Sequence, residues 1–406
     1  MKLLQINDSV NTGSTGRIAE DIGRITIAGR HQSFIAYGRE CHKSLSNIVK
    51  IGGKLTIFLH LIISRLCDLH GFGSAFATVI FISKLKKISP DIIHLHNIHG
   101  YYLNVKILFN YLKLSGKPLI WTLHDCWPFT GHCSYFDAVN CYKWEVECNS
   151  CPNLKGYPSS WFWDNSKDNY YRKRMLFSAH RNLTIITPSE WLAGHISKSF
   201  LKEYPVKVIH NGVDLSIFKP ITDKSLLRRY NIPDQPYIIG VASVWDERKG
   251  MMDFYKVRHH LPLHISIVLV GLNKKQLAGL PDGITGIPRT ENIHDLAALY
   301  SAANVFVNPT YIDNFPTTNL EALACGTPVI TYKTGGSPEA IDERTGFVLD
   351  QGDIMGIVTA IRIIIEKGKD QYSDSCRSLA ERRYNKDERY MEYVRMYENI
   401  IKIQNA

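Results

Sequence analysis

The sequence predicts an α/β protein made of two doubly wound parallel-sheet domains. A chain of 406 residues is too long for one ordinary core and indicates two domains. Its hydrophobic content of 45% and charged content of 21% are typical of globular proteins. Short, continuous apolar runs alternate with helical patterns, and this series occurs twice. Strands of that kind belong to parallel sheets that are covered on both faces.

The expected strands fall into two series with a joint near residues 201–219. The first series comprises residues 2–6, 33–37, 92–96, 119–123, 183–187 and 206–209, and the second comprises residues 237–241, 265–270, 305–308 and 329–331. We therefore expect an N-terminal domain of residues 1–205 and a second domain of residues 206–385. A helix expected over 386–406 fits packing on either domain, including a return to the N-terminal domain. Ligands are expected in the cleft between the domains, at the carboxyl ends of the strands.

The positive charge of the chain is confined to its first half. Residues 1–200 hold 23 Lys and Arg against 13 Asp and Glu, whereas residues 201–406 hold 25 of each, so the net charge of +10 lies before residue 201. A basic half suits nucleic acid, an anionic membrane surface or an acidic substrate. No zinc-finger or RNP-type motif is present, which argues against a nucleic-acid partner.

Two apolar segments with basic ends favour a membrane surface among these partners. Residues 54–65 and 75–87 are both too short to span a bilayer. Two interpretations stay open: core-facing helices of a large domain, or helices that lie on a membrane surface. The start MKLLQIND lacks the apolar run of a signal peptide, so we expect a cytoplasmic protein, peripheral on the inner face of the cell membrane.

The most informative segment runs from Val305 to Ile341. A buried strand, a loop with Asp313 and a helix carrying Glu321 follow one another. The two carboxylates would flank the start of the helix near Thr317 and Thr318, where unpaired N–H groups and the helix dipole favour a phosphate. Carboxylates also accept hydrogen bonds from sugar hydroxyls. Together these features predict a site for an activated sugar.

Three smaller motifs follow other expected strands. A small-residue loop at 11–17 with Gly16 would let the backbone approach an anion, and a turn without ligand fits it equally well. His124 ends an apolar strand, either facing a ligand or capping the next turn. Arg248 and Lys249 precede a helix and suit a diphosphate as charge partners, with a solvated basic turn as the alternative.

With these motifs the chain resembles a family 4 glycosyltransferase of the two-domain GT-B type, over essentially its full length. The resemblance rests on the Gly16 loop, His124, the run 210–214 with Phe218, the turn 248–250, and the block from Asp313 through Glu321 to Pro328. Within the family, the segment 313–316 and the Cys-rich segment resemble bacterial transferases of colanic-acid, O-antigen and exopolysaccharide assembly.

The family pattern assigns roles to several positions. It has two glutamates flanking seven residues: the second, matched by Glu321, is implied to bind the donor ribose. The first is implied to contact the donor sugar, and here Asp313 replaces it with a shorter carboxylate. Ser243 stands where a basic residue is usual before Lys249, so Arg248 is the candidate substitute.

The resemblance implies transfer of a hexose from a UDP- or GDP-linked sugar with retention of configuration and without a required metal. Lys249, Arg248 and the N–H groups near Thr317 and Thr318 would stabilise the leaving nucleoside diphosphate. Asp313 and His124 would hold sugar hydroxyls. The expected acceptor is a polyprenyl-diphosphate-linked saccharide at the membrane. A nucleotide-sugar epimerase and a non-catalytic saccharide-binding scaffold remain alternatives.

The long segment 126–158 has little periodicity and contains five cysteines, the first of them Cys126. The other four, Cys133, Cys141, Cys148 and Cys151, end in a Cys-x-x-Cys pair and would suit a tetrahedral structural zinc ion, with His132 able to replace one thiolate. Disulfides and unbound thiols packed in a core are the alternatives that stay open.

Overall fold

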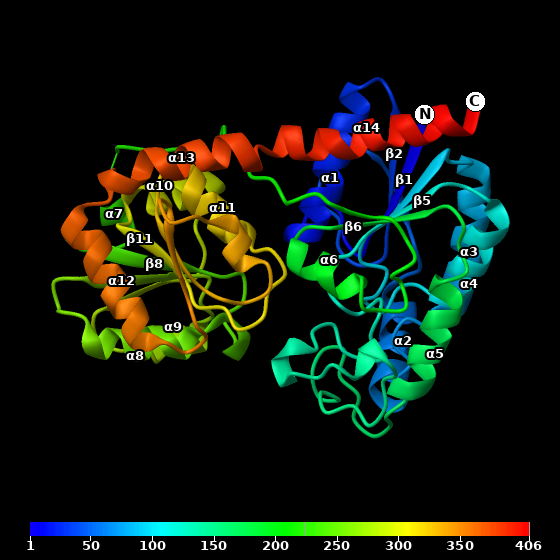
Figure 1. Ribbon diagram of the computed structural model, residues 1–406, viewed down its shortest axis with the longest axis horizontal. Coiled ribbons are helices and arrows are strands. Elements are labelled where there is room, and N and C mark those ends of the chain that lie inside the picture. Colours follow the sequence, from blue (N-terminus) through cyan, green and yellow to red (C-terminus); the bar gives the residue numbers. More distant parts are fainter. Residues whose placement is uncertain (224, 406) are drawn as a thin grey trace. The chain divides into compact units, whose positions relative to one another are not determined.

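The computed structural model describes residues 1–223 and 225–405, and these form two compact α/β units (Figure 1). Unit 1 comprises Met1–His210 together with the segment from Arg389 onward, and unit 2 comprises Asn211–Glu388. The chain therefore leaves unit 1 after His210 and returns to it at Arg389. No helix within the described residues has the length and apolar character needed to cross a membrane.

Unit 1 contains a seven-stranded sheet with the order β3-β2-β1-β4-β5-β6-β7, in which all the pairings are parallel. Its strands are β1 (Lys2–Ile6), β2 (Gln32–Tyr37), β3 (Asn47–Lys50), β4 (Ile92–Leu95), β5 (Leu119–Thr122), β6 (Leu183–Thr187) and β7 (Val206–Val208). Its helices are α1 (Gly13–Ala28), α2 (Lys54–Cys67), α3 (Ala75–Ile88), α4 (Val105–Ser115), α5 (Ser166–Phe177), α6 (Glu190–Ile196) and, from Arg389 onward, α14 (Lys386–Asn405).

Neighbouring residues of each central strand of unit 1 face opposite sides of the sheet, and each side has its own core. Leu4 of β1 belongs to the larger core, which α3, α4 and α5 help to form. Leu3 belongs to a second core with Ile18 of α1 and with Tyr393 and Tyr397 of α14. This burial on both faces explains why the strands are apolar without interruption.

Unit 2 contains a six-stranded, all-parallel sheet with the order β10-β9-β8-β11-β12-β13. Its strands are β8 (Tyr237–Val241), β9 (Ser266–Val270), β10 (Ile284–Ile287), β11 (Val305–Asn308), β12 (Val329–Tyr332) and β13 (Gly346–Leu349). Its helices are α7 (Ser225–Arg229), α8 (Met251–His260), α9 (Lys274–Ala278), α10 (Ile293–Ala302), α11 (Thr317–Ala324), α12 (Ile354–Lys367) and α13 (Asp370–Tyr384). The prediction of two parallel-sheet α/β domains is confirmed.

Helix α2 differs from the core-facing interpretation, whereas α3 agrees with it on one side, where Phe81 and Leu85 are in the core. In α2 only His60 and Ser64 are buried, while Leu55 is 69% and Phe58 is 56% exposed. On α3, Phe76 is 76% exposed. The core-facing interpretation is therefore wrong for most of α2, because the sheet face is already covered by other helices and only a narrow side of α2 reaches the core.

Candidate functional site

The centre of the candidate site in unit 2 is an ion pair between Lys249 and Asp313. Lys249 Nζ lies 2.6 Å from Asp313 Oδ2, and the two side chains are 27% and 19% exposed. Lys249 ends the short 3-10 turn Glu247–Lys249 after β8, and Asp313 lies in the loop between β11 and α11. Both loops follow the carboxyl ends of adjacent strands, since β8 pairs with β11. The residues that the sequence analysis singled out separately are thus brought together.

Two glycines allow these loops to approach closely. Gly250 follows Lys249 with φ +69°, and a Cβ there would lie 2.1 Å from the carbonyl oxygen of Pro309. A Cβ on Gly335 would lie 1.8 Å from the carbonyl oxygen of Asp313. In addition, the backbone N–H of Tyr311 donates to the carbonyl oxygen of Arg248 at 2.7 Å. The backbone around Lys249 and Asp313 is therefore fixed by contacts that only glycine permits.

Arg248 pairs with a different carboxylate from Lys249. Its guanidinium donates two hydrogen bonds to Asp246 Oδ2, at 2.9 Å from Nε and 2.8 Å from Nη2, and its side chain is 49% exposed. Ser243, at the usual position of the family cation, is exposed after β8. Lys249 is consequently the basic residue of this turn that the structure pairs with Asp313.

Helix α11 begins at Thr317, and Thr317 and Thr318 form its first turn as expected. The N-cap residue is Pro316, with no side-chain hydrogen bond capping this end within the described residues, and the first turn lacks acidic side chains. Buried Asn319 fixes the helix start: it accepts a hydrogen bond from Asn308 at 2.8 Å and donates one to Ser337 at 2.9 Å. The N–H groups of the first turn give this end a positive partial charge.

Glu321 lies one turn into α11 and is half-buried. The hydroxyl of buried Tyr300, in α10, donates to Glu321 Oε2 at 3.2 Å. Burial raises the pKa of Tyr300 well above its usual value, so the phenol stays protonated and keeps this donor. Tyr300 and Asn319 were missed by the sequence analysis, because an internal tyrosine or asparagine of a helix carries no distinctive pattern.

In unit 1, Gly16 and His124 follow β1 and β5. Gly16 lies inside α1, which begins at Gly13, so most of the expected loop 11–17 is the first turn of a helix. A Cβ on Gly16 would lie 3.1 Å from Ser9 Oγ. His124 Nε2 lies 3.1 Å from Nδ1 of buried His96, and burial lowers the pKa of His124 to about 4. At neutral pH His124 is therefore an uncharged imidazole, suited to hydrogen bonding with hydroxyl groups.

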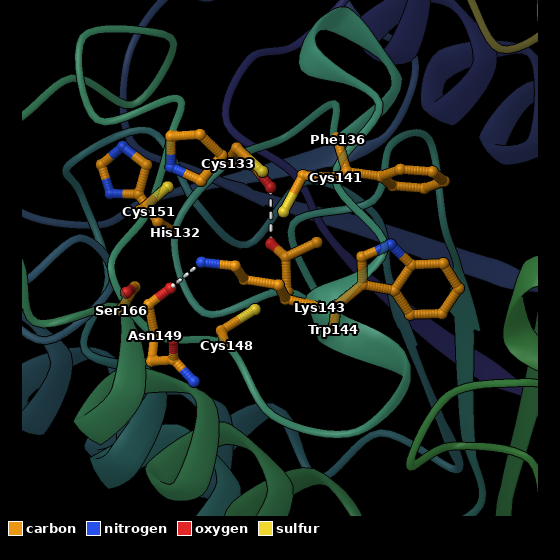
Figure 2. Close-up of a pocket in the computed structure, with 12 residues that line it drawn as sticks. His132, Cys133, Phe136, Cys141, Lys143, Trp144, Cys148, Asn149, Cys151 and Ser166 are labelled. Atoms are coloured by element: carbon orange, nitrogen blue, oxygen red, sulfur yellow. Dashed lines mark hydrogen bonds between the residues drawn. The ribbon is translucent and has the colours of Figure 1, made fainter.

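The segment 126–158 is held by an aromatic cluster of its own. The rings of Phe129 and Phe136 lie 4.8 and 4.9 Å from the ring of buried Trp144. All nine cysteines are free, so the disulfide alternative is wrong. Cys126 is fully buried in the core. Cys133, Cys141, Cys148 and Cys151 line one pocket of this segment together with His132 (Figure 2).

The predicted zinc site is not preformed in the structure. Within residues 1–223 and 225–405, no three or more His, Cys, Asp or Glu residues form a group that could hold a metal ion.

Known proteins and protein families are similar to this chain over most of its length. Residues 60–217 match the model of Glycosyltransferase Family 4, and residues 223–386 match that of Glycosyl transferases group 1. The putative colanic acid biosynthesis glycosyl transferase WcaC of Escherichia coli K12 is 25% identical over 421 residues, which cover 98% of this chain and 100% of the relative.

Solved structures share the fold. Sucrose-phosphate synthase from Thermosynechococcus elongatus superposes with a TM-score of 0.72 at 18% identity, covering 99% of each chain. Anabaena HepE, solved in complex with UDP, has a TM-score of 0.70 at 15% identity, covering 98% of this chain and 100% of that one. The two family matches divide the chain as its two sheets do, and the chain belongs to the group 1 glycosyltransferases of family 4, with the GT-B fold.

Proposed function

We propose that this glycosyltransferase moves a hexose from a nucleoside-diphosphate sugar to a growing lipid-linked saccharide, with retention of configuration, in surface polysaccharide assembly. The observation that carries the proposal is the Lys249–Asp313 pair in unit 2. It supplies a cation for a diphosphate and a carboxylate for sugar hydroxyls within 2.6 Å of each other. The UDP complex of HepE and the colanic acid name of WcaC support the donor and the pathway class.

The proposed chemistry is stabilisation of the leaving diphosphate. Lys249 and the start of α11 at Thr317 and Thr318 provide a preorganised positive field, so little reorganisation is needed as negative charge develops. Glu321, oriented by Tyr300, binds the donor ribose and takes no part in bond breaking. Arg248 is exposed enough to leave Asp246 and reach a phosphate. Asp313 orients the donor sugar.

In unit 1, neutral His124 and the backbone at Gly16 are proposed to contact the donor sugar and phosphate, and the rest of the unit to bind the acceptor. No metal is assigned to the transfer step in this proposal.

The first experiment is a thermal-shift screen of UDP, GDP and their sugars on the purified chain. Ligand at 100 times its dissociation constant should stabilise the chain by about 2.7 kcal/mol. Lys249→Ala and Glu321→Ala should abolish the shift, whereas the exposed Lys275→Ala and Glu366→Ala should keep it. A chain that binds none of these ligands would contradict the donor assignment.

A second measurement separates transfer from the alternative reactions. Incubation with the bound nucleotide-sugar and a lipid-linked acceptor should give nucleotide release that depends on the acceptor, and the anomeric proton of the product should show the configuration of the donor. Release of nucleotide without any acceptor would instead support the epimerase alternative. Binding of the nucleotide-sugar without turnover would support the scaffold alternative.

The acceptor would be met at a membrane surface formed by α2, α3 and the aromatic triplet 161–163. Its exposed apolar side chains are Leu55, Phe58, Leu59, Ile62, Ile63, Leu66, Phe76, Val79, Ile80, Trp161, Phe162 and Trp163. Ser74, which precedes α3, hydrogen-bonds His60 of α2 at 3.0 Å, and the N–H of Trp161 donates to the carbonyl oxygen of Arg65 at 2.7 Å. The three elements are therefore neighbours.

Charge supports lipid as the partner of this surface. Neither α2 nor α3 contains an acidic residue, while they carry Lys54, Arg65, Lys84, Lys86 and Lys87. Basic residues beside apolar ones favour anionic lipids, and tryptophan is enriched at membrane interfaces.

Vesicle co-sedimentation tests the membrane proposal. The chain should bind phosphatidylcholine vesicles that contain phosphatidylglycerol more strongly than vesicles without it, and added salt should weaken this binding. The double variant Phe76→Ser, Trp163→Ser should lose most of it. Leu114→Ser, at an 87% exposed apolar position of α4, is the matched control. Equal binding by both variants, or no binding by the original chain, would contradict the proposal.

A further inference from the structure

The pocket in segment 126–158 gathers soft metal ligands that the transfer reaction does not use. Its lining includes His132, Cys133, Cys141, Cys148 and Cys151 (Figure 2). Sulfur and imidazole nitrogen are the ligands that zinc prefers in structural sites. Cysteines alone do not identify a metal site, but two further groups support one here: His132, which lines the pocket, and Lys173, which donates to the carbonyl oxygen of the lining residue Thr130.

The first group is the imidazole of His132, whose side chain is fully buried. Its Nδ1 lies 2.5 Å from Asp68 Oδ1, and Asp68 is itself 2% exposed. Asp68 Oδ2 also accepts the backbone N–H of Asn165 at 3.0 Å, so the carboxylate is fixed. The other ring nitrogen, His132 Nε2, is buried and lacks a hydrogen-bond partner among the described residues.

A buried nitrogen without a hydrogen-bond partner is unfavourable. A carboxylate on one nitrogen of a histidine and a metal ion on the other is the usual arrangement of metal-binding histidines, since the carboxylate fixes the tautomer and the ring orientation. Figure 2 shows the His132 ring beside Cys151 in the pocket. A cation at Nε2 would satisfy this nitrogen.

The second group is the ammonium of Lys173, which is 1% exposed. Its Nζ donates to the carbonyl oxygens of Trp127 at 2.8 Å and Thr130 at 3.0 Å, and it lies 3.6 Å from the centre of the Trp127 ring. Carboxylates within ion-pair distance of this nitrogen are absent from the described part of the chain. Burial lowers the pKa of Lys173 to about 7, and the nearby Cys148 and Asp68 oppose this shift, so added negative charge in the pocket would favour the charged ammonium.

We propose that this pocket binds one zinc ion through Cys133, Cys148, Cys151 and His132. Three thiolates and a neutral imidazole on a divalent cation carry a net charge of −1, which the charge of Lys173 balances. Four thiolates would carry −2 and leave His132 Nε2 without a partner. The backbone N–H of Gly131 already donates to Cys148 Sγ at 3.2 Å, a contact that stabilises a thiolate.

Binding requires a local rearrangement, because the described side chains do not form a group that could hold a metal ion. A cysteine sulfur moves between three staggered positions by rotation about one bond, so thiols that line a common pocket can turn toward a common centre. Each of the three thiols then loses its proton to solvent as its sulfur–zinc bond forms, and His132 binds as the neutral imidazole. Zinc is not oxidised or reduced in this step.

The zinc ion would be structural and would act on unit 1 alone. It would tie residues 131–133 to residues 148–151, within the segment that follows His124 along the chain. Donor binding in unit 2 does not depend on it, so this inference and the proposed function can fail separately.

Metal analysis of the full-length chain, purified without chelator, tests the site. We expect close to one zinc per chain, and a large loss of it in Cys148→Ser, Cys151→Ser and His132→Asn. Cys67→Ser, at a half-buried cysteine outside the pocket, is the matched control. Cys141→Ser should retain zinc, since His132 is the fourth ligand. Loss in Cys141→Ser with retention in His132→Asn would replace the proposed set by four thiolates and overturn the role of His132.

Titration with Co²⁺ covers the case in which a variant fails to fold. Co²⁺ added to the metal-depleted original chain should give thiolate charge-transfer absorption with the intensity of three sulfur ligands. Binding of Co²⁺ should also release protons from the three thiols. A folded original chain that contains no zinc and gives no such absorption with Co²⁺ would overturn the proposal. The UDP thermal shift of unit 2 should be the same with and without the metal.

Discussion

Replacing Lys249 by methionine should slow transfer by about 10- to 30-fold in kcat/KM. The ammonium lies 2.6 Å from Asp313, in a site where both side chains are mostly shielded from water. A hydrogen bond to a charged group contributes about 1.5–3 kcal/mol. Because Lys249 is 27% exposed, we take the lower part of that range, about 1.5–2 kcal/mol. Each 1.4 kcal/mol or so changes a rate about tenfold, which gives the stated loss.

A double-mutant cycle with Asp313→Asn tests whether the two residues act as a pair. Asparagine keeps the shape of the side chain and removes its charge, so Lys249 loses the partner that orients it. The coupling energy should be about 1–2 kcal/mol, as for other charged groups in direct contact. The assay is the rate of nucleotide release with the donor that the binding screen identifies, measured for both single variants and the double variant.

Two outcomes would refute this reasoning. If Lys249→Met keeps the original kcat/KM, the ammonium does not stabilise the leaving group. If the losses of the two single variants simply add in the double variant, the ion pair has no role in catalysis. Lys275→Met, an exposed lysine of α9, controls for the loss of one positive charge from unit 2.

Three further predictions concern stability and are measured by urea unfolding. Gly250→Ala should cost at least about 2 kcal/mol, since its φ of +69° disfavours a side chain and a Cβ would lie 2.1 Å from Pro309 O; an unchanged midpoint would contradict this. Asn319→Ala should cost about 1–3 kcal/mol by leaving its buried partners unsatisfied, whereas a neutral result would mean that water replaces the amide. Burial lowers the pKa of both His60 and His124 to about 4, so the unfolded chain binds more protons below pH 6.5. Stability should thus fall between pH 6.5 and pH 4, by about 2 kcal/mol per histidine at pH 5, and His60→Gln should reduce this dependence.

The central strands could be predicted from the sequence, and three edge strands could not. Strands such as β1, β8 and β11 have the expected bounds, because burial on both faces makes them continuously apolar. The missed strands β3, β10 and β13 lie at the edges of their sheets. There a strand is only partly buried, as in β10, or not buried at all, as in β3, so residues such as Asn47 and Gly286 interrupt the apolar run.

The candidate site was predictable in its residue types and only partly in its contacts. Asp313 and Glu321 lie on one short segment, so their placement at the start of α11 followed from local pattern. The pairing of Lys249 with Asp313 depends on the order of β8 and β11 in the sheet, which spacing along the chain does not determine. The same holds for Asp68 and His132, which are 64 residues apart and meet only in the folded unit.

The return of the chain to unit 1 has a consequence for its synthesis. The core on one side of the first sheet includes Tyr390, Tyr393 and Tyr397 from α14, together with Leu3 and Ile18 from the beginning of the chain. A ribosome makes these tyrosines after the whole of unit 2. Unit 1 therefore waits for the segment from Arg389 onward before its apolar surface is covered, although domains commonly fold in the order in which they are made. A chain that stops early should expose that surface and be a preferred substrate for chaperones and proteases.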